Sequence, residues 1–225
     1  MWQLSQSVDG MTEACEAFTV PVVGGNVSLY NEANGHNIDP TPVVGMLGMT
    51  DTIEHAPPGM ALTECHRIIV LGPEGSGLGG SLWARAQGSQ GGDLPALDYE
   101  MHLRVAEVTR KLVSGGVVSA VHDIGGGGLG VALTEMAIAG GVGAIAARVS
   151  DHDALFSEAP SRVIVAVAPD NMGIVENMAE SMGVPITRLG LATGDQISFK
   201  GLVEGSLEDA TTQWRDRLPT AMGAQ

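Results

Sequence analysis

The sequence predicts a chain of mixed α and β structure that is divided into two parts. Apolar residues recur at helical spacing over residues 3–18, and an apolar, strand-like run follows from Val20. Pro57-Pro58-Gly59 then interrupts the chain, as is typical of a linker. Helix-like and strand-like segments alternate beyond it. We therefore expect a boundary near residue 57, with residues 1–56 and 57–225 as the two parts.

The first part is predicted to be a helix followed by strands. The helical positions are Leu4, Val8, Met11, Ala14, Cys15 and Phe18. One strand begins at Val20, and a second covers residues 42–49. One helix and two or three strands are too few to bury both faces of a sheet. This part is therefore expected to belong to something larger.

The second part is predicted to mix helices with strands. Residues 67–73 and 162–169 are two similar apolar strands, each of which leads into a helix. Residues 86–97 are glycine-rich and polar without periodicity, which favours an exposed loop. Periodicity predicts further helices over 98–114, 128–139, 170–182 and 206–217, and further strands near 117–122, 143–148 and 184–199.

Charge and composition exclude several classes of partner. The 225 residues carry a formal net charge of −15, so no basic surface is available for nucleic acid or for an anionic membrane. An acidic protein that handles phosphates must offset their charge with Mg²⁺, backbone N–H groups or a few arginines. The apolar stretch 138–147 is too short to span a bilayer. Two cysteines without metal-ligand spacing, and no targeting segment at the N-terminus, favour a reducing cytoplasm.

The run from Val20 to Glu32 is the first candidate site. Gly24 and Gly25 lack Cβ, so they allow positive φ and a close approach of backbone N–H groups to an anion. If a strand follows, Asn26 and Ser28 project from one face; an amide oxygen suits Mg²⁺ and a hydroxyl suits a phosphate or sugar. The same glycines are equally compatible with a turn that ends a hairpin.

A second glycine-rich site lies at residues 120–137, where a strand end, four glycines and an amphipathic helix follow one another. The free N–H groups and dipole at a helix N-terminus favour an anion, although a simple strand-to-helix turn would use similar residues. His122 is expected to be buried and hydrogen-bonded. Because neighbouring strand residues point to opposite faces, we expect Asp123 not to orient it as a dyad.

A third glycine run, Gly75 to Gly80, fits the G-x-G-x-x-G pattern of dinucleotide-binding folds. The context argues against that function, because the loop at 86–97 replaces the second strand with its acidic end. Gly79, Gly80 and Ser81 are instead expected to pack a helix that opens there against the sheet.

The run GGNVSLYNE (residues 24–32), followed by residues 38–48, resembles the synthetase subunit of phosphoribosylformylglycinamidine synthase. Residues 122–129 resemble a second motif of that family, with His122 and Asp123 matching, but Gly125 and Gly126 replace its usual Ser-Asp. That departure puts any side-chain role at those two positions in doubt and is similar to the related aminoimidazole ribonucleotide synthetase.

The resemblance implies an α/β and α+β fold. Residues 1–56 would be the tail of a second PurM-like N-terminal-type domain, and residues 57–225 a PurM-like C-terminal-type domain. It also implies an ATP-dependent ligase that converts formylglycinamide ribonucleotide (FGAR) and glutamine-derived ammonia to formylglycinamidine ribonucleotide (FGAM). By carry-over, Gly25 would contact ATP, Asn26 would ligate Mg²⁺ and Ser28 would contact FGAR.

The family further implies a glutaminase subunit and a small linking subunit as partners. Its catalytic histidine and most acidic metal ligands belong to an earlier half that this chain lacks, so we expect a C-terminal fragment that is inactive alone. Three alternatives stay open: another PurM-like ATP-using enzyme, a nucleotide-holding half without turnover, and an assembly domain. The first is disfavoured because the aminoimidazole enzyme has Gly-Gly-Glu-Thr where this chain has Gly-Gly-Asn-Val-Ser.

Overall fold

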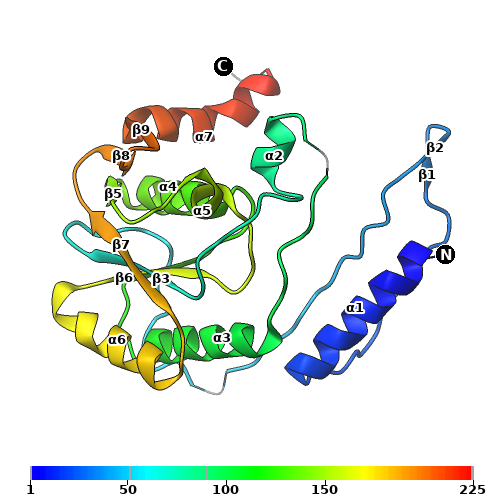
Figure 1. Cartoon of the computed structure of the whole chain (residues 1–225), viewed down its shortest axis with the longest axis horizontal. Coiled ribbons are helices and arrows are strands. Elements are labelled where there is room, and N and C mark those ends of the chain that lie inside the picture. The colour runs from blue at the N-terminus through cyan, green and yellow to red at the C-terminus, as the bar shows by residue number, and fades with distance from the viewer. Residues whose placement is uncertain (1, 51, 90, 224–225) are drawn as a thin grey trace. The chain divides into compact units, whose positions relative to one another are not determined.

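The structure, a computed structural model, describes residues 2–50, 52–89 and 91–223. The chain divides into two compact units, Met1–Thr52 and Ile53–Gln225. Figure 1 shows the first unit in blue and the second in cyan through red. Among the described residues, no helix combines the length and the apolar character that crossing a membrane requires.

The first unit contains one long helix and one small hairpin. Helix α1 (Trp2–Phe18) confirms the helix predicted over residues 3–18, although none of its described residues is buried. Strands β1 (Glu32–Ala33) and β2 (His36–Asn37) pair antiparallel. Asn34 and Gly35 join them with φ of 53° and 77°, which is the left-handed geometry that a two-residue Asn-Gly turn requires.

The strands predicted from Val20 and over residues 42–49 are wrong for this structure. The described residues of both segments have no regular secondary structure. Their apolar side chains are exposed, with Val23, Val43 and Leu47 retaining 96%, 94% and 94% of their accessible surface. A strand is held by backbone hydrogen bonds to a neighbour, and the described part of this unit supplies no neighbour for either segment.

The second unit is built on a seven-stranded sheet in the order β4-β6-β3-β7-β5-β8-β9. Neighbours pair antiparallel except β5 and β8, which are parallel. The strands are β3 (Arg67–Leu71), β4 (Ala120–Asp123), β5 (Ala144–Ala146), β6 (Val163–Val167), β7 (Ile186–Ala192), β8 (Gln196–Phe199) and β9 (Val203–Ser206). The two similar strands seen in the sequence, β3 and β6, are direct neighbours.

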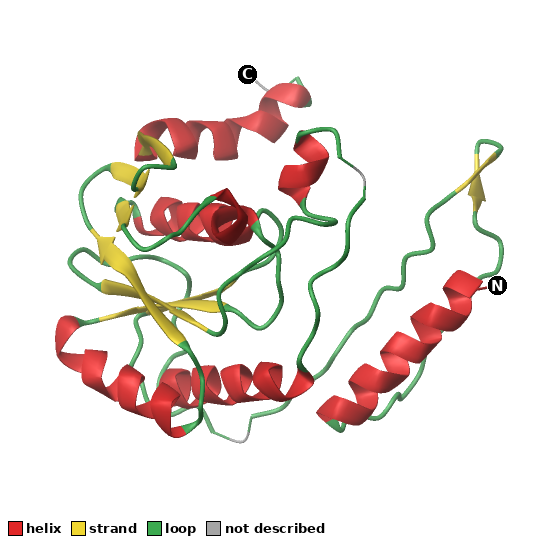
Figure 2. Cartoon of the chain, viewed as in Figure 1, coloured by secondary structure: helices red, strands yellow, loops and turns green. Residues whose placement is uncertain are grey.

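Helices cover both faces of this sheet (Figure 2). The four helices predicted in the second part are confirmed as α3 (Tyr99–Ser114), α4 (Gly128–Gly140), α6 (Met172–Ser181) and α7 (Leu207–Ala221). Helix α2 (Leu82–Ala86) is the short helix expected after Gly80, whereas α5 (His152–Phe156) was not predicted. The exposed loop predicted over 86–97 is confirmed for its described residues beyond Ala86.

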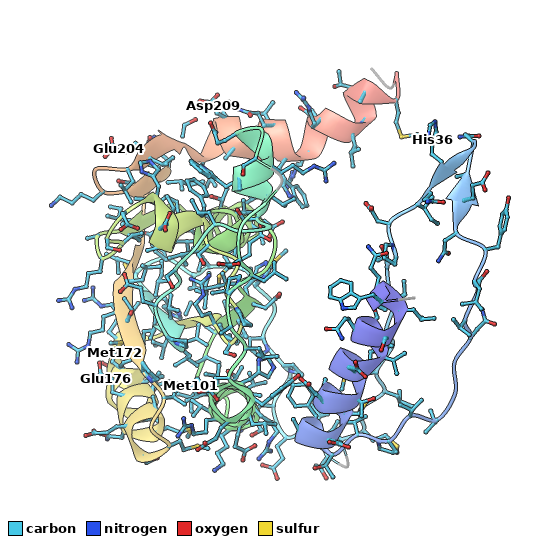
Figure 3. The ribbon with its side chains drawn as sticks, turned by 45° about the vertical axis from the view of Figure 1, so that its right-hand side comes forward. His36, Met101, Met172, Glu176, Glu204 and Asp209 are labelled. Atoms are coloured by element: carbon cyan, nitrogen blue, oxygen red, sulfur yellow. The ribbon has the colours of Figure 1, made fainter. Side chains whose placement is uncertain are left out.

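Two apolar cores, one on each face, hold the layers together. Alternation along β3 sends Ile68 and Val70 into the core beneath α4, and Ile69 and Leu71 into the core beneath α3 and α6. Figure 3 labels Met101 of α3 and Met172 of α6, which pack against the second core. The helix expected to be amphipathic, α4, is instead apolar over most of its surface, with Thr134 and Glu135 as exceptions, because the sheet, α5 and α7 pack against it.

Candidate functional site

The first candidate site is the exposed segment that holds Gly25, Asn26 and Ser28. All three residues are exposed and lie outside regular secondary structure. Neither Gly24 nor Gly25 has a positive φ, and a Cβ added to either would meet nothing within 4 Å. The expected nest of N–H groups and the expected alternation along a strand are therefore not formed. The roles of the three residues towards ligands stay predictions.

The second candidate site is the loop between β4 and α4. Gly127 caps α4 with φ of 83°, and Gly128 follows with φ of 68°. A Cβ on Gly128 would lie 2.7 Å from the backbone carbon of Phe156. Only glycine satisfies both the left-handed backbone and this close approach, so the loop geometry depends on it.

The anion at this loop is a side chain of the protein itself. Glu158 Oε1 accepts a hydrogen bond of 2.8 Å from the Gly127 N–H at the start of α4 and one of 2.7 Å from the Leu82 N–H at the start of α2. Both N–H groups are free of intrahelical partners, and the helix dipole favours a carboxylate there. Glu158 thus ties the glycine loop to the segment that follows Gly80.

A buried arginine supports the turn that carries Glu158. Arg162 is only 4% exposed, and its guanidinium donates to the carbonyl oxygens of Ser157 and Ala159. Burial lowers the pKa of Arg162, because desolvation disfavours its charged form. Gly75 provides the space for it, since a Cβ at that position would lie 2.2 Å from Arg162 Nη1.

His122 sits between two carboxylates beside the loop. Its Nδ1 lies 3.2 Å from Asp123 Oδ1, and its Nε2 lies 3.2 Å from Glu135 Oε2. The expected hydrogen bonding of His122 is confirmed, whereas its side chain is only partly buried, at 18% exposed, and not fully buried as expected. The expectation that Asp123 would not orient His122 is contradicted by this contact, because Asp123 ends β4 and its exposed side chain is not held to the opposite face. Sequence analysis missed Glu135, which lies thirteen residues along the chain on α4.

The described residues do not by themselves form a metal centre. No group of three or more histidine, cysteine, aspartate or glutamate residues is placed to hold an ion within residues 2–50, 52–89 and 91–223. Asn26 offers one neutral oxygen, whereas Mg²⁺ requires six ligands in near-octahedral geometry. The described donors by themselves therefore do not complete the coordination shell of Mg²⁺.

The glycine run at 75–80 serves packing. Ser81 caps α2 by accepting a hydrogen bond from the Ala84 N–H, which confirms that a helix opens there. A Cβ on Gly79 would lie 2.1 Å from the Asp93 carbonyl oxygen. The glycine thus allows contact with the exposed loop rather than with the sheet.

Family comparison identifies the class of protein. The model of the C-terminal domain of AIR synthase related proteins matches residues 66–200, and that of the N-terminal domain matches residues 1–50. The chain belongs to the AIR synthase related family. The expected order, the end of a PurM-like N-terminal-type domain followed by a C-terminal-type domain with a mixed sheet, is confirmed.

Within that family the chain is similar to the PurL subunit of phosphoribosylformylglycinamidine synthase. It is 40% identical over 229 residues to the Moorella thermoacetica subunit, and the alignment covers 98% of this chain and 31% of that relative. This confirms the resemblance carried by the GGNVSLYNE run. The chain spans about a third of the length of the relatives that it matches.

Solved structures show the same fold at low identity. PurL of Thermotoga maritima in complex with FGAR aligns with a TM-score of 0.60 at 17% identity, covering 69% of this chain and 29% of the other. The ATP complex of the same protein gives 0.56 at 16% identity, with coverage of 69% and 27%. PurLQS of Thermotoga maritima gives 0.54 at 17% identity, with coverage of 68% and 27%.

Proposed function

We propose that this chain is part of an ATP-dependent C–N ligase that converts FGAR and glutamine-derived ammonia to FGAM in purine biosynthesis. The observation that carries the proposal is the GGNVSLYNE run at residues 24–32, set in a chain that is 40% identical to a PurL subunit over 98% of its length. We assign residues 1–56 to the tail of the second N-terminal-type domain and residues 57–225 to the C-terminal-type domain.

The reaction that this family membership supports consists of two successive nucleophilic displacements. The amide oxygen of FGAR attacks the γ-phosphorus of ATP, ADP leaves, and an iminophosphate forms. Ammonia then attacks the imidate carbon, and phosphate leaves with the oxygen. Both steps move negative charge onto phosphate oxygens, so the protein contributes chiefly by placing donors and by neutralising charge.

Within this scheme each residue of the first motif has one task. Gly25 contacts ATP, because a residue without Cβ lets phosphate oxygens approach the backbone. Ser28 contacts FGAR through its hydroxyl. Asn26 contributes one oxygen ligand to Mg²⁺, and the remaining ligands come from other parts of the enzyme or from solvent. Bound Mg²⁺ would offset phosphate charge.

The proposed partners follow from the relatives. FGAR and ATP are bound by Thermotoga maritima PurL, and PurLQS of that organism has been solved as a complex. We infer a glutaminase subunit and a small linking subunit as the protein partners, and a cytoplasmic location. The net charge of −15 opposes nucleic acid and anionic membranes as partners.

The test is FGAR-dependent release of ADP, with ammonium as nitrogen donor. This chain is mixed with the remainder of a PurL-type synthetase that lacks the corresponding segment. The mixture should be active, and Asn26→Ala or Ser28→Ala should each reduce kcat/KM at least ~10²-fold, a loss of ~2.7 kcal/mol of transition-state stabilisation. Asn37→Ala and Ser5→Ala, which change the same residue types at exposed positions outside the motif, are the matched controls.

The outcomes separate the alternatives. Activity that survives both motif substitutions would refute the assigned roles. A folded, associated mixture without activity would instead favour a nucleotide-holding or assembly segment. Binding of Mg²⁺-ATP by this chain without the remainder then distinguishes these two, because a nucleotide-holding segment predicts binding that survives without it and an assembly segment predicts none. The chain alone is expected to release no ADP.

A further inference from the structure

A cavity of about 500 Å³ lies in the second unit between α4, α5, α7 and the strand pair β8–β9. All of its lining residues belong to positions 130–214, so it is formed within one compact unit. Its volume falls within the range typical of pockets for small molecules.

The walls of the cavity are mainly apolar and aromatic. Phe156, Phe199 and Trp214 line it together with aliphatic side chains of α4 and β8. The ring of Phe156 is held in place by stacking on Trp83, with ring centroids 6.0 Å apart and an interplanar angle of 21°. Trp214 is 56% exposed, so one wall is open to solvent. Such walls suit a flat ring that stacks on aromatic side chains.

The charged groups of the lining all have the same sign. Glu135 and Asp209 carry carboxylates, and none of the described lining residues is a lysine, arginine or histidine. His122 contacts Oε2 of Glu135, and no described residue is hydrogen-bonded to Oε1. Figure 3 labels Asp209 at the start of α7 and Glu204 on the adjacent strand β9. The lining is therefore complementary to a cation.

We infer that this cavity binds a small molecule that has a flat aromatic body and a basic amine. The aromatic body occupies the space beside Phe156 and Trp214, and the protonated amine faces Glu135 and Asp209. Ring stacking and a cation near aromatic faces both contribute to binding in such a site. The inference does not depend on the proposed ligase reaction, because the cavity contains none of the residues of the first motif.

The probe is 1-naphthylmethylamine, with 1-naphthylacetate as the ring-matched anion. Binding to the complete 225-residue chain is measured by titration in an NMR experiment that observes the ligand. A ligand of twelve non-hydrogen atoms in a partly open site should reach a Kd of about 0.1–1 mM. The acetate should bind at least about tenfold more weakly, because two carboxylates repel it.

Two substitutions test the location. Gly205 lies on the same face of β9 as Val203, and both line the cavity, so a side chain at 205 would project into it. A Cβ there meets nothing within 4 Å, and Gly205→Leu should fold and weaken amine binding at least about tenfold by filling the space. Glu135→Gln removes one charge without changing shape and should weaken binding about fivefold.

Glu204→Gln is the matched control, because it removes the same charge from the opposite face of β9. Glu204 contacts the Ser198 hydroxyl at 3.3 Å and does not line the cavity. It should leave the Kd unchanged, and circular dichroism should show that all variants retain the fold. The inference is overturned if the amine does not saturate, if the acetate binds equally well, or if Glu204→Gln weakens binding as much as Glu135→Gln. It is also overturned if a folded Gly205→Leu variant binds like the parent chain.

Discussion

Replacing Glu158 by alanine tests whether one carboxylate holds the glycine loop. The side chain accepts hydrogen bonds of 2.8 Å from Gly127, the N-cap residue of α4, and of 2.7 Å from Leu82, the first residue of α2. A hydrogen bond to an ionised group contributes about 1.5–3 kcal/mol to stability. Glu158 is half-buried and Leu82 is exposed, so water that enters the space left by the side chain is expected to offset roughly half of the loss.

We therefore expect Glu158→Ala to lower the free energy of unfolding by about 2 kcal/mol, which for a unit of this size corresponds to about 4–8 °C in melting temperature. Glu158→Gln keeps an acceptor oxygen but loses the charge, so its effect should be about half as large. The matched control is Glu180→Ala, an exposed glutamate near the end of α6, which should change stability by less than about 0.5 kcal/mol.

Urea unfolding followed by circular dichroism measures the free energy, and hydrogen exchange measures the local effect. In Glu158→Ala the amides of Leu82 and Gly127 should exchange faster because their hydrogen bonds are lost. The exchange rates of amides in β3 should change only as much as the global free energy of unfolding changes. If both amides exchange as in the parent chain and the unfolding free energy is unchanged, Glu158 does not anchor the loop. The order of the loop would then depend only on the backbone geometry of Gly127 and Gly128.

Three further predictions concern the second unit. In Gly190→Ala the new Cβ would lie 1.8 Å from the Ile145 carbonyl oxygen on the neighbouring strand, so thermal unfolding should show a loss of about 3 kcal/mol or more; an unchanged melting temperature would contradict the β5–β7 pairing. Gly173→Ala places a Cβ in open space within α6 and should instead stabilise by about 0.5–1 kcal/mol in urea unfolding, and a destabilised variant would argue against a helical residue 173. The hydrogen bond from Arg110 lowers the pKa of Glu107 to about 2, so this carboxylate contributes stability above its ordinary pKa of 4.5 that is lost as the pH falls towards 2. The free energy of unfolding should therefore fall less steeply between pH 4.5 and about pH 2 in Glu107→Gln than in the parent chain. The difference should be small, because the ion pair is exposed to solvent. Identical pH dependences would show that the pair does not form in solution.

Most of the second unit could be predicted because its elements are long and periodic. Helix α3 begins at Asp98, whose side chain accepts from the Met101 N–H, and it ends at Gly115. Such capping signals are visible in sequence. Helix α5 has five residues and strand β9 four, which are too short to show a period. The single strand predicted over 184–199 is two, β7 and β8, because β5 inserts between them in the sheet.

The first unit shows where prediction from the sequence fails. Residues 20–23 and 42–49 contain apolar and β-branched side chains that favour strands, but propensity alone does not make a strand. A strand needs a neighbour for its N–H and C=O groups, and a neighbour can be supplied by residues far away in sequence. The hairpin at 32–37 could have been found, since Asn34-Gly35 is a strong two-residue turn signal.

The position of Glu158 and Glu135 could not be predicted for a related reason. Each acts on a partner that is distant in sequence: Glu158 on Leu82, seventy-six residues earlier, and Glu135 on His122 across the start of α4. A single sequence shows spacing along the chain but not which carboxylate the sheet brings to a helix N-terminus. The glycine motif at residues 120–137 predicted an anion-binding position, and in the structure the carboxylate of Glu158 occupies it.

The charges of the chain explain why the proposed activity should require more than these residues. With a net charge of −15, the chain must offset the negative charge of ATP with a small number of cations. Three of its arginines, Arg104, Arg110 and Arg188, already pair with glutamates, and a fourth, Arg162, is buried against carbonyl oxygens. The N–H group of Gly127 is likewise occupied by Glu158. Fewer cations are therefore left to offset the charge of ATP, and cationic groups or Mg²⁺ ligands from the remainder of the synthetase would supply the rest, which is the physical reason that activity is tested in the mixture.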